Sequence, residues 1–432
     1  MALDTKSTEI VAGIAEEDIA AVFKTEKEIE RVKFLLKNAA EESKDKKLKY
    51  KRNQKKYIDF FIKLQLMFKY GFHWRKPLYP FRFIKNIFSS RRSLLKGKNE
   101  IQLRGCEFDI TFKCNFNCSH CSVARLDNGR PRKEMTVEEY KKVVNQAMEL
   151  GAVSFGIEGG EPFVRRDWDK VIEACNPKKN HIIISSNGYL FNDQVAKKCA
   201  KIGVDTINFS LDNGIPELHD LFRKKQGSFE RVINAVSLCR KYGIKVLLNT
   251  VVHKHNLYTT GLKRLIDFAE KEKILVHILL AKAIGNFKNN DSMLDDEDLK
   301  AYRKLLTLSP YLFVHHETRF AYGGGGCNGT KEMLQLTPYG DVMHCANMHV
   351  YFGNVRNEPL SEIRKRALKK TPFGRYRPCF LALDKDFMNI YYPLLDKKAA
   401  ISIEELGQAI SEYEKRRGIV LYPELYNLPQ EV

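Results

Sequence analysis

The sequence predicts an α/β protein built around a barrel of six strand–helix units. Six short apolar segments alternate with helix-length segments from Arg104 onward, and unusual polar or glycine-rich runs follow the first four of them. Consecutive units of this kind give parallel strands with right-handed crossovers. The active site of such a barrel gathers at the carboxyl ends of its strands. The expected strands are residues 107–112, 153–158, 181–185, 206–211, 245–252 and 276–280.

The bulk composition is that of a globular protein. The chain has 432 residues, 44% of them hydrophobic, which suffices for one large domain and one or two smaller ones. We find no secretory signal pattern and no uncharged apolar run of about 18 residues, so we expect a cytoplasmic location. Ten cysteines fit that compartment, and disulfides are not expected. Four of them are expected to be buried small hydrophobes: Cys106, Cys175, Cys199 and Cys239.

Positive charge is concentrated near the N-terminus. Residues 1–43 are mixed in charge and predict a surface or partner-facing helix from about Glu16. Residues 44–98 hold 18 Lys and Arg against two Asp, interleaved with large apolar residues, and account for +16 of the net +20. Pro77 and Pro80 divide this stretch into two helical pieces.

Three cysteines fall within eight residues directly after the first expected strand. Cys114, Cys118 and Cys121 in the run CNFNCSHC can wrap one metal centre, and thiolates favour iron–sulfur clusters, zinc or copper(I). A structural zinc site needs four closed ligands. His120 could supply the fourth, but its place between Ser119 and Cys121 makes that awkward. An iron–sulfur cluster with one open iron is the favoured interpretation.

This CxxxCxxC motif resembles the signature of the radical S-adenosylmethionine (SAM) superfamily. The resemblance covers roughly Arg104 to Gly285 and implies a partial (β/α)6 barrel. It also implies that Cys114, Cys118 and Cys121 hold a [4Fe-4S] cluster whose open iron binds SAM. One electron from the cluster would then cleave SAM to a 5′-deoxyadenosyl radical.

The same resemblance implies which residues contact SAM. Gly159, Gly160 and Glu161 resemble the GGEP element that receives the SAM ammonium, although Glu161 could be a solvated acid at a helix start. Ser186 and Asn187 match the element of strand 3 that contacts the ribose.

Three further polar residues lie near the fourth strand. Ser210 resembles a polar contact after that strand. Arg223 matches an arginine that pairs with the SAM carboxylate, and a surface arginine in a basic helix is the competing interpretation. Asp212 could simply cap the following turn.

A second cysteine set follows the barrel. Cys327 and Cys345 flank a hairpin expected at residues 333–337 and 342–344, and Cys379 comes later. This pattern resembles a shortened SPASM or twitch domain with one auxiliary [4Fe-4S] cluster, supported by the turn at Gly353 and Asn354. Cys379 could instead be a buried thiol. The fourth iron is left to His344, His349 or Asp384, or to the substrate.

These segments give the expected domain organisation. Residues 1–98 form a basic helical region, 99–320 the partial barrel, 321–385 the small auxiliary-cluster domain of hairpin and helices, and 386–432 a helical tail.

Two functions remain in competition. The first is a radical SAM oxidoreductase that takes electrons from a flavodoxin or ferredoxin and acts on a peptide, lipid-linked or small-molecule substrate. The second is a zinc-binding, non-catalytic nucleic-acid-binding protein that uses the basic arm. The fold cannot choose the substrate, and no catalytic acid or base can be named.

The basic stretch at residues 44–98 has four interpretations. It could lie on an anionic membrane, peripheral to its inner surface, where each cation adds about 1 kcal/mol. It could dock an acidic leader peptide, or RNA phosphates, although nucleic acid is the less favoured partner. Otherwise its apolar residues pack on the barrel while its lysines face water, which is the usual case.

Overall fold

One curved sheet of eleven strands organises the described residues of the computed structural model, which are 16–49, 65, 69, 76–97, 100–124, 126, 132–287, 291–314, 326–396 and 398–426. The strand order is β11-β10-β9-β8-β1-β2-β3-β4-β5-β6-β7. The strands are β1 Gly105–Asp109, β2 Ser154–Glu158, β3 His181–Ser186, β4 Thr206–Ser210, β5 Lys245–Val252, β6 Leu275–Leu280, β7 Leu312–Val314, β8 Met333–Leu336, β9 Asp341–Cys345, β10 Met348–Asn354 and β11 Ile401–Ser402.

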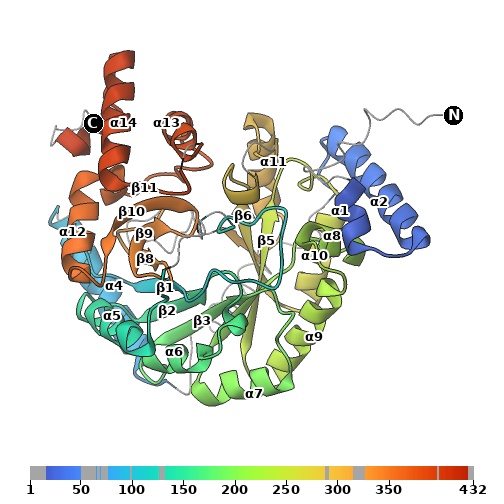
Figure 1. The fold of residues 1–432 in the computed structure, drawn as a ribbon, viewed down its shortest axis with the longest axis horizontal. Helices are drawn as coiled ribbons and strands as arrows, with labels where there is room; N and C mark the ends of the chain where they lie inside the picture. The colour runs from blue at the N-terminus through green and yellow to red at the C-terminus, as the bar shows by residue number, and fades with distance from the viewer. Residues whose placement is uncertain are drawn as a thin grey trace.

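Helices cover the outer side of this sheet, as Figure 1 shows for α5, α6, α7 and α9. The helices are α1 Glu16–Val22, α2 Glu26–Lys44, α4 Tyr79–Leu95, α5 Val137–Glu149, α6 Trp168–Ala174, α7 Asp193–Ile202, α8 Pro216–Arg223, α9 Ser228–Lys241, α10 Thr260–Lys271, α11 Asp296–Leu306, α12 Leu360–Lys370, α13 Lys385–Leu395 and α14 Ile403–Arg417. Short 3-10 turns lie at Pro162–Val164, Gly285–Phe287, Pro372–Gly374 and Pro423–Tyr426.

The six expected strands are confirmed as β1 to β6, and all pair in parallel. Every second residue of β3, β5 and β6 is fully buried against the helices, whereas the residues between them are half-buried. This alternation arises because one face of each strand meets the helices and the other faces the inside of the barrel. The polar runs of the sequence therefore share the rim at the carboxyl ends.

The N-terminal segment differs from expectation, because two helices replace the single predicted one. Thr25 begins α2 with a reciprocal capping box to Glu28, which ends the path of α1. Both helices are held in place by contacts within the chain. They pack on α8 through a buried apolar cluster of Ile19, Val22, Phe23, Val32, Leu36, Leu218 and Leu221. The first basic helical piece lies almost entirely outside the described residues, and the second is α4.

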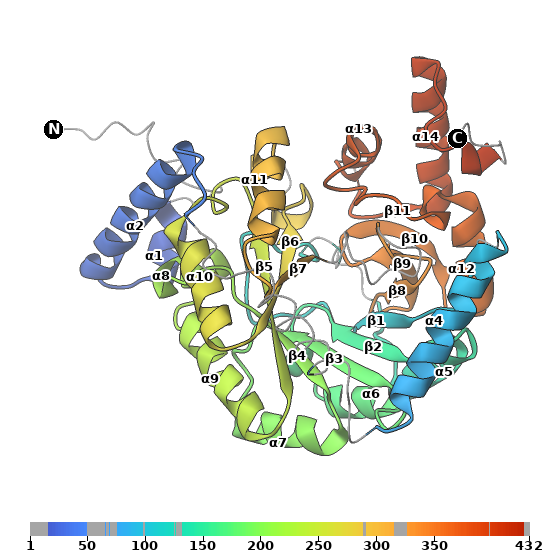
Figure 2. The ribbon, with the colours of Figure 1, turned by 180° about the vertical axis from the view of Figure 1, so that it is seen from behind.

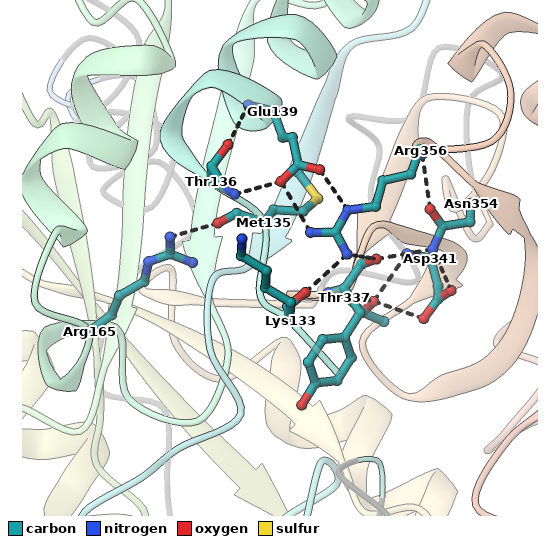
Figure 3. Close-up of polar contacts among 10 residues, drawn as sticks. Lys133, Met135, Thr136, Glu139, Arg165, Thr337, Asp341, Asn354 and Arg356 are labelled. Carbon is teal, nitrogen blue, oxygen red and sulfur yellow. Dashed lines mark hydrogen bonds and ion pairs between the residues drawn. The ribbon is translucent and has the colours of Figure 1, made fainter. Parts of the chain in front are cut away.

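The expected hairpin is present as β8 and β9, and it belongs to the barrel sheet. β8 pairs in parallel with β1, with Glu107 opposite Gln335, and β9 continues antiparallel to β8. Figure 3 shows the junction, where the Arg356 guanidinium contacts both oxygens of Glu139 on α5 at 2.6 and 3.1 Å. Arg356 also bonds the Lys133 carbonyl at 3.0 Å. Side chains from both parts of the chain therefore lock the hairpin to the first barrel helix.

Helix α4 lies across the amino ends of the first strands (Figure 2), at the end of the barrel opposite the polar rim. The amide of Asn86 donates to the carbonyls of Leu103 and Gly151, which precede β1 and β2. Arg82 bonds the Asn180 side chain, which precedes β3. Within the described part of the chain, no helix is both long and apolar enough to cross a membrane.

The packing of α2 on α8 gives a stability prediction. Leu36 is 3% exposed in the apolar cluster, so Leu36→Ala should lower the free energy of unfolding by about 2–5 kcal/mol. Phe34 on the same helix is 63% exposed, and Phe34→Ala should change it by less than about 0.5 kcal/mol. Urea unfolding followed by circular dichroism measures both. Equal effects of the two variants would contradict this packing.

Candidate active site

The three cysteines of the first motif lie on one loop after β1. Cys118 is buried, Cys121 is half-buried and Cys114 is the most exposed residue of the three. Partial desolvation of its sulfur still raises the pKa of Cys114 to about 12, and the neighbouring Cys118 and Cys121 add to that rise. Burial likewise raises the pKa of Cys118 to about 11. These thiols therefore need the positive charge of a bound metal centre to become thiolates.

Two glycines after β2 hold the start of this loop. Gly160 donates its N–H to the Thr111 carbonyl at 2.8 Å, and Glu161 donates to the Lys113 carbonyl at 2.9 Å. A Cβ on Gly159 or Gly160 would stand 2.2 Å from a backbone oxygen of residue 111 or 113, so no larger residue fits at either position.

A turn after β6 closes the other side of the loop. The Asn286 side chain donates to the Cys118 carbonyl at 2.7 Å, and its N–H donates to the Cys121 carbonyl at 3.0 Å. Gly285 has a φ of +54°, and a Cβ there would lie 1.9 Å from the Cys121 oxygen. Sequence reasoning missed both residues, because only the fold brings the β6 turn to the β1 loop.

Glu161 is fully buried and bonded within the chain, so it is not a solvated acid. Its carboxylate accepts from the Ser186 hydroxyl at 2.9 Å and from the Asn187 N–H at 2.8 Å. Burial raises its pKa to about 7. The Asn187 amide reaches on to Asn115 at 2.8 Å and to the Cys114 sulfur at 3.9 Å. Glu161 thus ties the second and third strand ends to the cysteine loop.

Arg223 is 8% exposed at the end of α8 and is not a surface arginine. Its guanidinium forms an ion pair with Asp212 at 2.6 Å and donates to the Cys118 sulfur at 3.8 Å. Asp212 also accepts from the Val251 N–H at 3.0 Å, so it anchors the arginine. Ser210 ends β4 opposite Asn249.

His120 packs as an aromatic ring. It stacks on Phe222 with ring centroids 4.5 Å apart and an interplanar angle of 3°. Burial holds its pKa well below the usual value. This stacking accounts for a histidine between Ser119 and Cys121 without making it a ligand.

The second cysteine set gathers at the open end of the hairpin. Cys327 donates its N–H to the Arg377 carbonyl at 2.7 Å, two residues before Cys379, and its sulfur lies 3.3 Å from His344, which precedes Cys345. Burial raises the pKa of Cys327, and the neighbouring Cys345 and Cys379 raise it further. Of the residues considered for the fourth iron, Asp384 already accepts from the Phe387 N–H and the Tyr422 hydroxyl. His349 is buried on β10.

His344 is held firmly beside Cys327. Its Nε2 lies 3.3 Å from the Cys327 sulfur, and its Nδ1 lies 2.8 Å from the Thr330 hydroxyl. The ring packs on Phe373 with centroids 4.3 Å apart. Thr330 adopts a φ of +61°, which is strained for a β-branched residue. A Cβ on Gly329 would lie 2.5 Å from the imidazole.

The turn after β6 contacts the first cysteine set and brings a positive charge toward the second. Gly285 and Asn286 contact the first set as described. The Lys282 ammonium lowers the pKa of Cys327 and Cys345, against the larger effect of burial. Its Nζ atom donates to the Leu280 carbonyl at 3.2 Å.

Three carboxyl groups inside the barrel escaped the sequence analysis. Glu107 and Asp109 alternate on β1, and Asp109 lies opposite Glu158 on β2. Burial raises the pKa of Asp109 to about 8, and Glu158 raises it further. Burial also raises the pKa values of Glu107 and Glu158. Acids at every second position of an apolar strand were the signal available in the sequence.

The remaining cysteines are confirmed as buried: Cys106, Cys175, Cys199 and Cys239. Among the described residues, no three His, Cys, Asp or Glu side chains are close enough to hold one metal ion. A four-iron cluster instead binds each cysteine at a separate corner, so its ligands stand further apart. Three soft donors with a glycine cradle fit such a cluster.

Comparisons with known proteins agree with this chemistry. Residues 108–259 match the radical SAM superfamily, and residues 327–385 match the SPASM iron-sulfur cluster-binding domain. Two curated relatives come from Methanosarcina barkeri. An Fe-coproporphyrin III synthase is 28% identical over 59% of this chain and 72% of its own. An AdoMet-dependent heme synthase is 24% identical over 60% of this chain and 81% of its own.

Solved structures share the fold. SuiB of Streptococcus suis bound to its precursor peptide SuiA has a TM-score of 0.51 at 18% identity, over 63% of this chain and 67% of that one. The enzyme anSMEcpe with bound AdoMet and a peptide has a TM-score of 0.51 at 16% identity, over 76% of this chain and 98% of that one.

The zinc-binding alternative finds no support in these comparisons. The family implies a [4Fe-4S] cluster that binds SAM and a second, auxiliary iron–sulfur cluster. The chain contains a radical SAM domain and a SPASM domain and is an enzyme that cleaves SAM to a 5′-deoxyadenosyl radical for hydrogen abstraction from a substrate.

Proposed function

We propose that Cys114, Cys118 and Cys121 hold the SAM-binding cluster and that the residues around them position it. The observation that carries this proposal is the closure of the cysteine loop from two sides, by Gly160 and by Asn286. When bound, the cluster supplies the electron that cleaves SAM. The partially charged backbone carbonyls near Gly159 and Gly160 remain for the SAM ammonium, because Glu161 is engaged by Ser186 and Asn187.

The other SAM contacts follow the strand ends. Ser186 and Asn187 border the ribose side, and Ser210 lies at the neighbouring end of β4. The main role that we propose for Arg223 is at the cluster-binding cysteines. Its charge offsets the Cys118 thiolate while Asp212 fixes its direction.

We propose that Cys327, Cys345 and Cys379 would hold the auxiliary cluster, which would act as an electron acceptor when bound. His344 is then not a ligand but donates its Nε2 hydrogen to the Cys327 sulfur, from which it lies 3.3 Å away. The Thr330 hydroxyl fixes the ring by contacting Nδ1.

Asp109 and Glu158 are our candidates for moving protons in the reaction. They face the inside of the barrel from neighbouring strands, and burial raises the pKa of both carboxyl groups, that of Asp109 to about 8. Oxidation of a carbon-centred radical releases a proton, which the ionised member of such a pair would accept.

The substrate class rests on the relatives. Two curated relatives are named for coproporphyrin and heme synthesis, so an iron tetrapyrrole is the first small molecule to test. A precursor peptide, as in the SuiB complex, is the second. A ferredoxin or flavodoxin is proposed as the electron donor. Peripheral contact with an anionic membrane through residues 44–98 completes the proposal, given their excess of cations.

The first test is SAM cleavage. Protein reconstituted anaerobically with iron and sulfide should hold about eight irons and form 5′-deoxyadenosine from SAM and dithionite. Cys118→Ala should abolish that product and remove about half the iron, whereas Cys345→Ala should leave SAM cleavage in place. Cys199→Ala, at a buried cysteine of α7, is the matched control. SAM cleavage by the Cys118→Ala variant would contradict the assignment of Cys118 as a ligand of the SAM-binding cluster.

Closure of the loop by the β6 turn is tested at Gly285. Gly285→Ala should reduce iron at the first site and slow SAM cleavage at least about tenfold, since the new Cβ collides with the Cys121 carbonyl. Gly243→Ala is the matched control, because Gly243 has a φ of +70° with no atom within 4 Å of a built Cβ. If both variants load iron equally, the turn does not support the loop.

The role of His344 is tested by spectroscopy. His344→Ala should leave the auxiliary cluster intact and lower its reduction potential, because the lost N–H···S bond stabilised the more negative reduced form. Thr330→Val should shift it in the same direction by less. Redox titration followed by electron paramagnetic resonance measures both shifts, with the SAM-binding cluster as internal reference. Loss of an iron in His344→Ala would show instead that His344 is a ligand.

A further inference from the structure

Helix α4 exposes a stripe of large apolar side chains on the side that faces away from the barrel, where an ordinary surface helix is polar. Four side chains of this stripe, spaced by three, seven and seven residues, point into solvent: Leu78 is 71% exposed, Phe81 71%, Phe88 70% and Leu95 89%. Ile84, 48% exposed, lies beside them. The expectation that the apolar residues of the basic stretch pack on the barrel therefore holds only in part for this helix, because Phe83 and Ile87 are half-buried whereas these five are exposed.

The inner face of α4 packs on the barrel through both apolar and polar contacts. Tyr79 is 8% exposed and packs against the ring of His181, with centroids 5.7 Å apart. Asn86 bonds two backbone carbonyls, and Arg82 bonds the Asn180 amide oxygen. These contacts hold the helix in place without the exposed apolar side chains, which are left free for another surface.

The charges around the apolar stripe of Leu78, Phe81, Phe88 and Leu95 indicate what kind of surface it binds. Lys85, Arg91, Arg92 and Lys96 are exposed on the same helix, and residues 78–97 contain no Asp or Glu. Among the described residues none of these four cations forms an ion pair with an acid. Aromatic and aliphatic side chains between cations match the boundary between anionic headgroups and acyl chains. An acidic protein would offer the charge but not the apolar layer.

We infer that α4 docks the enzyme on an anionic lipid surface, with Phe81 and Phe88 entering the boundary region and the four cations on the headgroups. This inference rests on the peripheral contact proposed above and adds its orientation. The helix contacts the chain just before β1, β2 and β3, while the first cysteine set lies on the loop beyond the carboxyl end of β1. The reaction rim therefore faces away from the bilayer, and docking places the enzyme without feeding it a substrate embedded in lipid.

Vesicle co-sedimentation tests the inference with the reconstituted full chain. Wild type should bind phosphatidylglycerol vesicles and not phosphatidylcholine vesicles. The double variant Phe81→Ser, Phe88→Ser should bind at least about tenfold more weakly. Phe34→Ser is the matched control, because Phe34 is 63% exposed on α2, a helix rich in glutamate. It should bind like wild type.

Two further measurements separate the possible outcomes: SAM cleavage reports on the active site, and light scattering reports on the oligomeric state. All three proteins should form 5′-deoxyadenosine at equal rates, so a loss of that activity would count against the active-site assignment and not against docking. Equal vesicle binding by wild type and double variant would overturn the role of α4. A wild-type dimer that becomes a monomer in the double variant, with no vesicle binding, would show that a second copy covers the stripe.

Discussion

The turn after β6 is the constraint on which the rest of the site depends. Gly285 permits its approach to the Cys121 carbonyl, and Asn286 binds the carbonyls of Cys118 and Cys121. The positive charge of Lys282, in the same turn, lowers the pKa of Cys327 and Cys345 in the second cysteine set. The turn therefore fixes the backbone of the first cysteine loop and adds positive charge near the second set.

A second layer of support comes from far along the chain. Helices α1 and α2 cover α8 through apolar packing, and α8 ends in Arg223, which reaches Cys118. The N-terminal helices α1 and α2 thus support, through α8, the arginine that contacts the Cys118 sulfur. On the opposite side, Glu161 links the GGEP turn to Ser186 and Asn187, so strands β2 and β3 hold the loop together.

Local sequence patterns predicted the strands of the barrel and the two cysteine sets. Short continuous apolar runs mark β3 and β5 in the sequence, and the spacing of Cys114, Cys118 and Cys121 indicates a metal centre without any knowledge of the fold. The break between α1 and α2 was missed because it contains no Gly or Pro, although Thr25 and Glu28 carried a capping-box signal.

What the sequence could not reveal depends on long-range contacts. Nothing local shows that Glu161 is engaged by β3, or that the acids of β1 and β2 lie opposite each other on neighbouring strands. His344 could be recognised as a neighbour of cysteine but not as the partner of Thr330, since that contact needs the turn that brings residue 330 back to β9. The outward face of α4 was equally hidden, because an amphipathic pattern does not say which side meets the protein.

The parallel pairing of β8 with β1 makes the SPASM hairpin a structural neighbour of the barrel's first strand. A shortened chain ending before residue 326 would leave β1 with a bare row of backbone donors and acceptors, which invites edge-to-edge association between molecules. The barrel and the SPASM region are consequently poor candidates for separate expression. Sequence change in the SPASM region is restrained by the need to keep β8 paired with β1.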